Sequence, residues 1–162
     1  MKFIDMSENY PFTGVGNMLN FYNGLLKIKP NRKILFIFDN DTAGNEAYDK
    51  CVMTKQKNIK AIKLPVMEEF NQIQCEGPYG IISDNINGKA VSIELFLDLE
   101  FRKKEKPMVL WLSFNKRSKK YQGELIKKES YIKFFKTAIR NNDKNYNYKK
   151  LRELLEYIIR RD

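Results

Sequence analysis

Apolar and polar residues alternate along the first half of the chain in segments that predict strands and helices in turn. The run Lys33–Phe38 is apolar after its first residue, which is typical of a parallel strand buried on both faces. Apolar residues at helical spacing begin after Gly14 and stop at Pro30, so we expect a helix there. The other elements expected in this half are strands at 2–6 and 59–64 and a helix at 45–55.

The pattern is less regular in the second half. Residues 68–87 show little periodicity and contain a Gly-Pro-Tyr-Gly stretch, which predicts a long loop. Asn87 or Gly88 would cap a helix over residues 90–97, and Pro107 precedes an apolar strand, Met108–Phe114. Beyond that strand we expect a basic loop at 115–120, a helix at 125–139, an Asn-rich linker at 141–147 and an amphipathic helix at 148–161.

This alternation predicts an α/β fold, in which helices cover both faces of a sheet. We expect residues 1–115 to form the α/β domain and residues 116–162 to form a basic loop and helical extension packed on it. The apolar stripe of the last helix would pack on the body of the domain or form an interface with a partner.

Composition removes several classes of function. The chain is 43% hydrophobic, enough for a core, yet it has no run of eighteen apolar residues that would cross a membrane. Its start resembles no signal peptide, and its two cysteines are isolated, as reduced thiols of a cytoplasmic protein would be. Histidine is absent, which excludes Ser-His-Asp catalysis and imidazole-based zinc sites. Carboxylates, lysines, tyrosines or an oxygen-bound metal must therefore supply any chemistry.

The net charge of +10 is concentrated in one part of the chain. Residues 1–98 carry 11 Lys and Arg against 12 Asp and Glu, whereas residues 99–162 carry 19 against 8. A basic half next to a neutral one indicates a polyanionic partner, most simply nucleic acid. The alternative is a solvated Lys-rich surface, which the many Asn residues would fit as part of a general Lys and Asn bias.

Two aspartates follow the buried strand directly. Asp39-Asn40-Asp41 precedes Thr42-Ala43-Gly44 and the start of a helix, at the carboxyl end of a strand, where α/β sheets bind ligands. Two carboxylates one residue apart can reach the same hard cation, and oxygen ligands suit Mg²⁺ or Mn²⁺. Alternatively, one of these aspartates only caps the helix. Capping explains one aspartate well and two less well.

The stretch Ile34–Gly44, a hydrophobic strand followed by Asp-x-Asp-x-x-Gly, resembles the second motif of TOPRIM domains. The preceding segment, 3–26, is similar to the middle βα unit of the TOPRIM domains of overcoming-lysogenization-defect (OLD) family nucleases. More weakly, 87–94 and 121–124 resemble TOPRIM proteins found with HEPN-type domains. The resemblance implies a Rossmann-like, mostly parallel sheet and Mg²⁺- or Mn²⁺-dependent cleavage of nucleic acid, DNA rather than RNA. It also suggests, by analogy, a defence or toxin context.

One departure from the TOPRIM pattern bears on catalysis. TOPRIM domains carry a glutamate after their first strand, and this chain has no such strand and glutamate before Phe3. We therefore expect a fragment of a longer protein, with a fused upstream domain or a homo-oligomer as partner, or else a degenerate domain. Whether the chain is an enzyme by itself stays open at this stage.

The resemblance implies that Asp39 and Asp41 hold the metal and carry catalysis. Asp5 and Glu8 could add oxygens to the metal shell, or could be an ordinary turn residue and a solvated residue. Glu46 is expected to interact with the dipole of its helix. Glu94 is expected to be a structural group paired with a lysine or arginine, or else part of the site. The candidate nucleic-acid ligands are Lys116, Arg117, Lys119, Lys120 and Tyr121, which combine cations with an aromatic ring. Five further cations continue them at helical spacing, or form a solvated face: Lys127, Lys128, Lys133, Lys136 and Arg140.

Three other classes of protein compete with the nuclease. A haloacid-dehalogenase phosphatase also uses strand-Asp-x-Asp, but Ala43 stands where its pattern needs Thr or Val, and Asp84 stands alone downstream. A receiver-like phosphoacceptor lacks its acidic pair at the first strand. The stronger rival is a non-catalytic nucleic-acid-binding or assembly domain with a vestigial metal site.

Overall fold

A parallel pair of strands lies at the centre of the N-terminal half. The structure is a computed structural model that describes residues 14–54, 56–102 and 106–161. Helix α1 (Val15–Ile28) leads into strand β1 (Ile34–Phe38), and helix α2 (Thr42–Val52) leads into strand β3 (Ile59–Lys63). β1 and β3 pair in parallel, with Ile34 opposite Ile59. These elements confirm the strands and helices expected here, while the strand expected at 2–6 lies outside the described residues.

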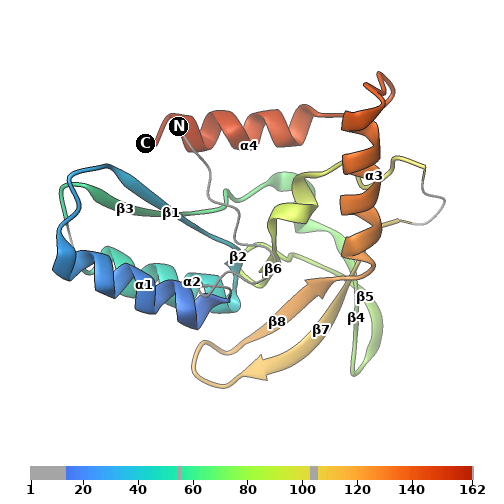
Figure 1. The fold of residues 1–162 in the computed structure, drawn as a ribbon. Coiled ribbons are helices and arrows are strands. Elements are labelled where there is room, and N and C mark those ends of the chain that lie inside the picture. The colour runs from blue at the N-terminus through green and yellow to red at the C-terminus, as the bar shows by residue number, and fades with distance from the viewer. Residues whose placement is uncertain (1–13, 55, 103–105, 162) are drawn as a thin grey trace.

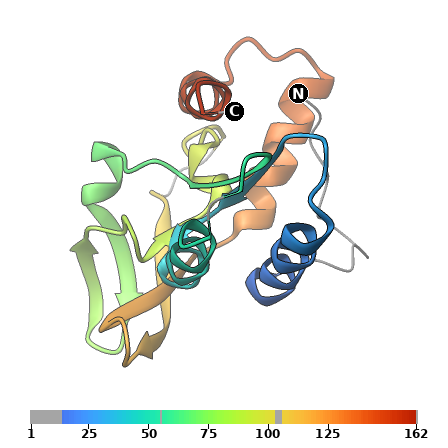
Figure 2. The ribbon, with the colours of Figure 1, turned by 90° about the vertical axis from the view of Figure 1, so that its left-hand side faces the viewer.

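Alternate residues of β1 enter two different cores. Phe36 and Phe38 pack with Tyr22 of α1 and Ala47 of α2, because side chains on a strand point to opposite faces in turn. Leu35 and Ile37 pack instead against the core that includes Leu154 and Ile158 of helix α4 (Lys149–Ile159). Helices thus cover both faces of the parallel pair, with α1 and α2 on one side and α4 on the other (Figures 1 and 2). The last helix therefore packs on the body through its apolar stripe, the first of the two roles expected for it.

The segment expected to be a loop at 68–87 is a short 3-10 helix and a hairpin. The 3-10 helix η1 (Glu68–Asn71) precedes strands β4 (Ile73–Gly77) and β5 (Gly80–Asp84), which pair antiparallel. Gly80 makes the turn with a φ of 94°, a left-handed conformation that favours glycine. Every side chain of β5 except Asp84 is exposed, so the strand lacks the apolar alternation that would reveal it.

The prediction of a helix over residues 90–97 is wrong. Residues Ala90–Val91 form strand β6, and a 3-10 helix, η2 (Ile93–Phe96), follows it. β6 pairs antiparallel with β2 (Asn40–Asp41), the short strand that contains the second aspartate of the motif. Burial of Ala90 and Val91 as well as Leu95–Leu97 produces an apolar density like that of a helix, although the backbone is extended at one end.

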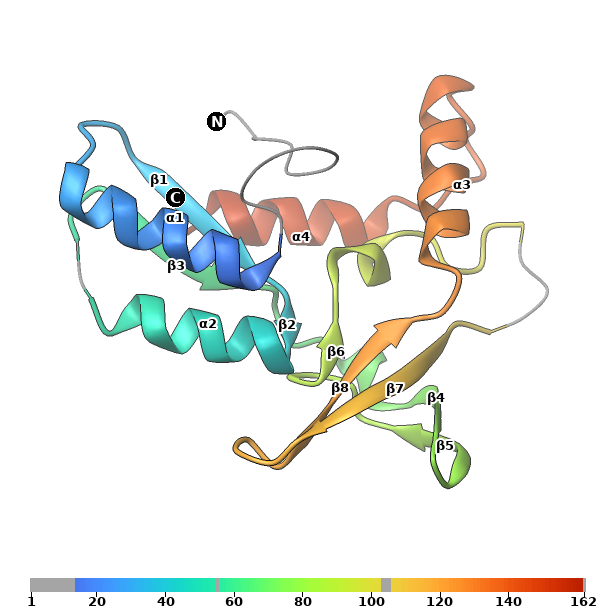
Figure 3. The same ribbon diagram turned by 60° about the horizontal axis from the view of Figure 1, so that its bottom comes forward.

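A four-stranded sheet joins the hairpin in the middle of the chain to the two strands that precede α3 (Figure 3). Its order is β5-β4-β7-β8, where β7 is Met108–Asn115 and β8 is Lys120–Leu125. The basic segment 115–120 is thus mostly the tight turn between β7 and β8, and helix α3 (Lys128–Arg140) begins three residues later than expected. β8 lies in the expected C-terminal extension, yet it pairs with β7 of the expected first domain.

The described residues therefore form a mixed α/β fold, as the sequence predicts in outline. Their strand pairings are parallel for β1 with β3 and for β4 with β7, and antiparallel for the other three pairs, so the sheets are mixed rather than mostly parallel. In the part of the chain that the structure describes, no helix is both long and apolar enough to cross a membrane.

Candidate acidic site at the Asp39–Asp41 turn

The two aspartates lie where the first parallel strand meets the second half of the fold. β1 ends at Phe38, Asp39 follows, and Asp41 ends the short strand β2, directly before α2. Gly44 lets this turn close tightly. A Cβ at Gly44 would lie 2.2 Å from the Asp39 carbonyl oxygen and 2.9 Å from Asp41 Oδ1, so no larger residue fits without moving the turn.

Asp41 is the N-cap of α2. Its Oδ1 accepts a hydrogen bond from the Gly44 amide at 2.6 Å, which satisfies one of the free N–H groups of the first helical turn. Its Oδ2 accepts a second from Gln122 Nε2 at 2.7 Å, and Gln122 Oε1 in turn accepts from the Ala43 amide at 3.0 Å. Asp41 therefore does cap the helix, and Gln122 of β8 fixes both the aspartate and the helix start.

Asp39 has no comparable capping role. The loss of solvent around the carboxylate, together with the nearby negative charges of Asp41 and Glu94, raises the pKa of Asp39 to about 7. A hydrogen bond from the Ile93 amide and the positive charge of Lys128 oppose this rise in pKa without cancelling it. A carboxylate held in this state is a candidate functional group, because the fold provides too little positive charge to neutralise it.

The structure brings Glu94 near this site. Glu94 lies on η2, close enough to Asp39 for its charge to raise the pKa of that carboxyl. Lys128, the first residue of α3, hydrogen-bonds and ion-pairs with Glu124 of β8. That hydrogen bond, together with the charges of Glu124, Glu94 and Glu129, raises the pKa of Lys128. Four carboxylates from different elements thus surround a single lysine.

A buried asparagine and a half-buried one hold the acidic turn against its neighbours. Asn40, between the two aspartates, is 1% exposed, and its Oδ1 accepts from Asn45 Nδ2 at 3.1 Å. Asn45 also donates to the Asp41 carbonyl at 2.5 Å and accepts from Lys63 Nζ at 2.6 Å. Asn40 Nδ2 finds no hydrogen-bond partner among the residues that the structure describes. A buried amide with an unmade bond is costly, so the site keeps Asn40 at some expense in stability.

The donor chemistry fits a hard divalent cation, although no ligand set is preassembled. All the candidate ligands are carboxylate oxygens, which suit Mg²⁺ or Mn²⁺. Among the described residues, however, no three acidic or cysteine side chains converge with the geometry of a metal centre. Gln122 already donates a hydrogen bond to the Asp41 carboxylate. Asp39 and Glu94 have no such bond to Gln122, so their carboxylates are the more available ligands. Asp5 and Glu8, the further ligands implied by the TOPRIM resemblance, lie outside the described residues.

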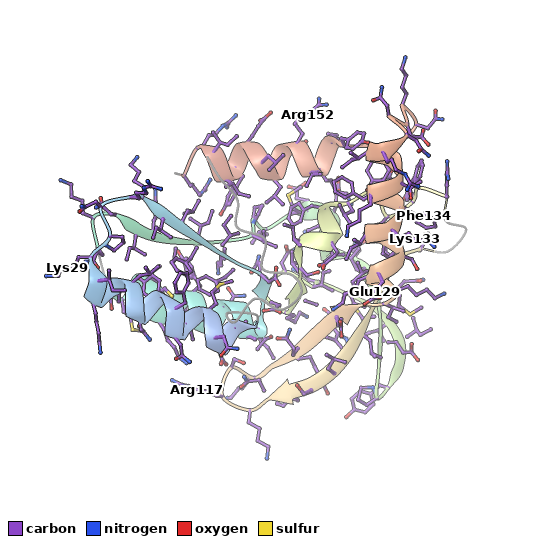
Figure 4. The ribbon with its side chains drawn as sticks, viewed as in Figure 1. Lys29, Arg117, Glu129, Lys133, Phe134 and Arg152 are labelled. Carbon is purple, nitrogen blue, oxygen red and sulfur yellow. The ribbon has the colours of Figure 1, made fainter. Side chains whose placement is uncertain are left out.

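The predicted nucleic-acid ligands lie on the β7–β8 hairpin. Lys116, Arg117 and Lys119 are exposed at its turn, and Figure 4 shows Arg117 at the tip, away from the core. Lys120 and Tyr121 begin β8. The hairpin is bound to α2, because Asn115 Nδ2 donates to Glu46 Oε1 at 2.8 Å and Thr42 Oγ1 donates to the Tyr121 carbonyl at 2.7 Å. Glu46 therefore holds the hairpin, a contact not expected from its place in the helix.

A second basic surface follows the outer side of α3. Lys133, Lys136 and Arg140 are exposed and line an open groove together with Glu129, Ile132 and Thr137. Figure 4 shows Glu129 and Lys133 on successive turns of this helix, which starts at the acidic site. The structure is thus consistent with either reading of these cations, a polyanion path or a solvated face.

Comparison of the chain with protein-family models, with curated proteins and with solved structures gives no match.

Proposed function

We propose that this protein carries out metal-dependent cleavage of nucleic-acid phosphodiester bonds, with the Asp39–Asp41 turn as its active site. The proposal is based on the environment of the Asp39 carboxyl. Its pKa is raised to about 7 beside two further carboxylates, which is the electrostatic state that a divalent cation relieves. When bound, such a cation would supply charge neutralisation at the scissile phosphate and activation of water.

In this proposal the side chains of the site divide into three roles. Asp39 and Glu94 provide direct oxygen ligands, and Asp41 contributes one of the lone pairs that its two hydrogen bonds leave free. Gln122 holds Asp41 in place from β8. Lys128 is a cation whose charge acts on Asp39 and Glu94, and it would contact a phosphate oxygen, while Glu124 orients its ammonium group.

One observation favours a second candidate, a nucleic-acid-binding or assembly domain without catalysis. Both Asp41 oxygens already accept hydrogen bonds, so the residue has a full structural role without any metal. The basic hairpin would then be the functional part of the protein, and the acidic turn would only join the two halves of the fold.

Cleavage assays with matched variants separate these candidates. Supercoiled plasmid and single-stranded RNA are incubated with Mg²⁺ or Mn²⁺ and with the wild type, Asp39→Asn or Asp49→Asn. Asp49 is the control, since it is an exposed carboxylate on α2, the helix that follows the acidic turn. Cleavage by the wild type and the control, but not by Asp39→Asn, supports the nuclease. Salt-sensitive binding without cleavage by any of the three proteins selects the binding domain.

A further inference from the structure

The β7–β8 hairpin presents partly exposed aromatic rings beside its cations. Phe114 is 50% exposed, and its ring centroid lies 5.1 Å from that of Tyr121. Tyr121 in turn lies 5.8 Å from Trp111, which the core almost covers. We call these three residues the aromatic face. The exposed half of the Phe114 ring is free to pack against a partner, which would gain stabilisation by covering it.

A bulge in β7 creates this face. Trp111 is opposite Gly123 and Phe114 is opposite Tyr121, so three steps along β7 correspond to two steps along β8. In a regular strand, residues three apart point to opposite faces. The extra residue between Trp111 and Ser113 reverses the alternation and turns Phe114 to the side of Trp111 and Tyr121. Without the bulge, Phe114 would point away from both rings.

The hairpin turn next to the aromatic face carries charge of one sign, while Lys89, near Trp111, is paired with Asp84 at 2.7 Å. Lys116, Arg117, Lys119 and Lys120 lie within five residues, and no carboxylate occurs between Phe114 and Gly123. Lys119 has a φ of 53°, a left-handed conformation for which glycine is the usual choice, so the turn keeps a cation where the backbone favours glycine. Lys89 lies over the Trp111 ring at 5.3 Å, at the inner end of the face.

We propose that the aromatic face binds single-stranded nucleic acid, with bases stacked on Phe114 and Tyr121 and phosphates held by the cations of the turn. The proposal rests on the proposed function in taking nucleic acid as the partner, and it adds the form of the substrate. Exposed rings can stack with unpaired bases of any sequence. In a duplex the bases are already stacked, so a duplex would use the cations alone.

The hairpin also relates the bound strand to the acidic site. Successive residues of β8 have different tasks: the Tyr121 ring belongs to the aromatic face, and the Gln122 amide holds Asp41 at 2.7 Å. The Tyr121 carbonyl accepts the bond from Thr42 at the start of α2. A strand stacked on Tyr121 therefore lies at a fixed register relative to the acidic turn.

The test compares single-stranded and duplex binding in the absence of divalent metal. Fluorescence anisotropy follows a short labelled oligonucleotide, alone or annealed to its complement, in EDTA at low salt. The proteins are the wild type, Phe114→Ala, Phe114→Tyr and Ile81→Ala. Ile81 is the control, because it is an apolar side chain of the same sheet that is 60% exposed. Circular dichroism checks that each variant is folded, which we expect for side chains this exposed.

We expect the wild type to bind the single strand more tightly than the duplex. Phe114→Ala should weaken single-strand binding roughly fivefold or more, the loss typical of one stacked base, and should leave duplex binding unchanged. Phe114→Tyr and Ile81→Ala should bind as the wild type does, since the first keeps a ring and the second lies outside the face.

Three results would overturn the inference. Equal losses for single strand and duplex in Phe114→Ala, or no loss at all, would remove the stacking role while nucleic-acid binding itself survives. No binding of either form by the wild type would refute this inference, whereas the proposed function is refuted separately, by the absence of cleavage with Mg²⁺ or Mn²⁺. Self-association that Phe114→Ala abolishes, measured by sedimentation, would assign the face to a second copy of the chain.

Discussion

Replacing Asp39 by asparagine should stabilise the folded protein, and should do so more strongly at about pH 8 than at about pH 5. The Asp39 carboxyl has a pKa of about 7 in the fold against an ordinary value of 3.8. The unfolded chain therefore releases this proton at lower pH than the folded protein does. The contribution of the protonated carboxyl to the stability of the fold is full below pH 3.8, and it is lost as the pH rises through about 7.

The size of the effect follows from the same two values. A rise in pKa from 3.8 to about 7 costs roughly 4 kcal/mol at about pH 8 and roughly 1.5 kcal/mol at about pH 5. Asparagine stays neutral at both values and keeps an oxygen that can accept the hydrogen bond from the Ile93 amide. The advantage of Asp39→Asn should thus grow by roughly 2 to 3 kcal/mol between the two pH values.

Urea denaturation of the wild type, Asp39→Asn and Asp49→Asn at both pH values, without divalent metal, measures this difference. The Asp49→Asn control should change stability by less than about 0.5 kcal/mol at either pH, because its side chain is exposed. If Asp39→Asn raised the free energy of unfolding by the same amount at both pH values, the claim that the fold raises the pKa of Asp39 would be refuted.

Three further substitutions test the structure around the site. Gly44→Ala should destabilise the protein by roughly 2 kcal/mol or more, since its Cβ would clash with the Asp39 carbonyl, whereas Gly24→Ala in α1 has open space and should stabilise by roughly 0.5 to 1 kcal/mol; thermal melts compare the two. Gln122→Ala should cost roughly 1 to 3 kcal/mol in urea, because it leaves two polar partners at the start of α2 unsatisfied, while exposed Gln74→Ala should cost little. Lys119→Gly should raise the free energy of unfolding by up to about 1 kcal/mol, by relieving the left-handed backbone, and should weaken nucleic-acid binding; an unchanged affinity would mean that this cation contacts no phosphate.

The elements with a strong hydrophobic signal could be predicted from the sequence. β1 has a continuous apolar run because both of its faces are buried, and α4 shows the periodic stripe that packs against the parallel pair. β5 and β8 gave no such signal. β5 is exposed along most of its length, and β8 contains a glycine opposite Trp111 and polar residues that contact α2. The periodicity of apolar residues reflects burial of side chains. It therefore misses strands such as β5 and β8, which are held by backbone pairing and, for β8, by polar contacts with a segment distant in the sequence.

The candidate site was predictable only in part, for a related reason. Asp39 and Asp41 stand out because two carboxylates follow an apolar run, but nothing local distinguishes the capping role of Asp41 from the crowded carboxyl of Asp39. Glu94 sits in an apolar segment 55 positions after Asp39, and only the pairing of β2 with β6 brings the two together.

Binding of Mn²⁺ is the measurement that tests the central claim most directly, since it needs no knowledge of the substrate. The electron paramagnetic resonance signal of free Mn²⁺ is followed during titration into the wild type, Asp39→Asn, Glu94→Gln and Asp49→Asn. The account predicts that the wild type and Asp49→Asn bind the ion, more tightly as the pH rises through about 7, and that Asp39→Asn and Glu94→Gln lose this binding. Equal binding by Asp39→Asn and the wild type, or no binding by the wild type, would contradict a metal site at this turn.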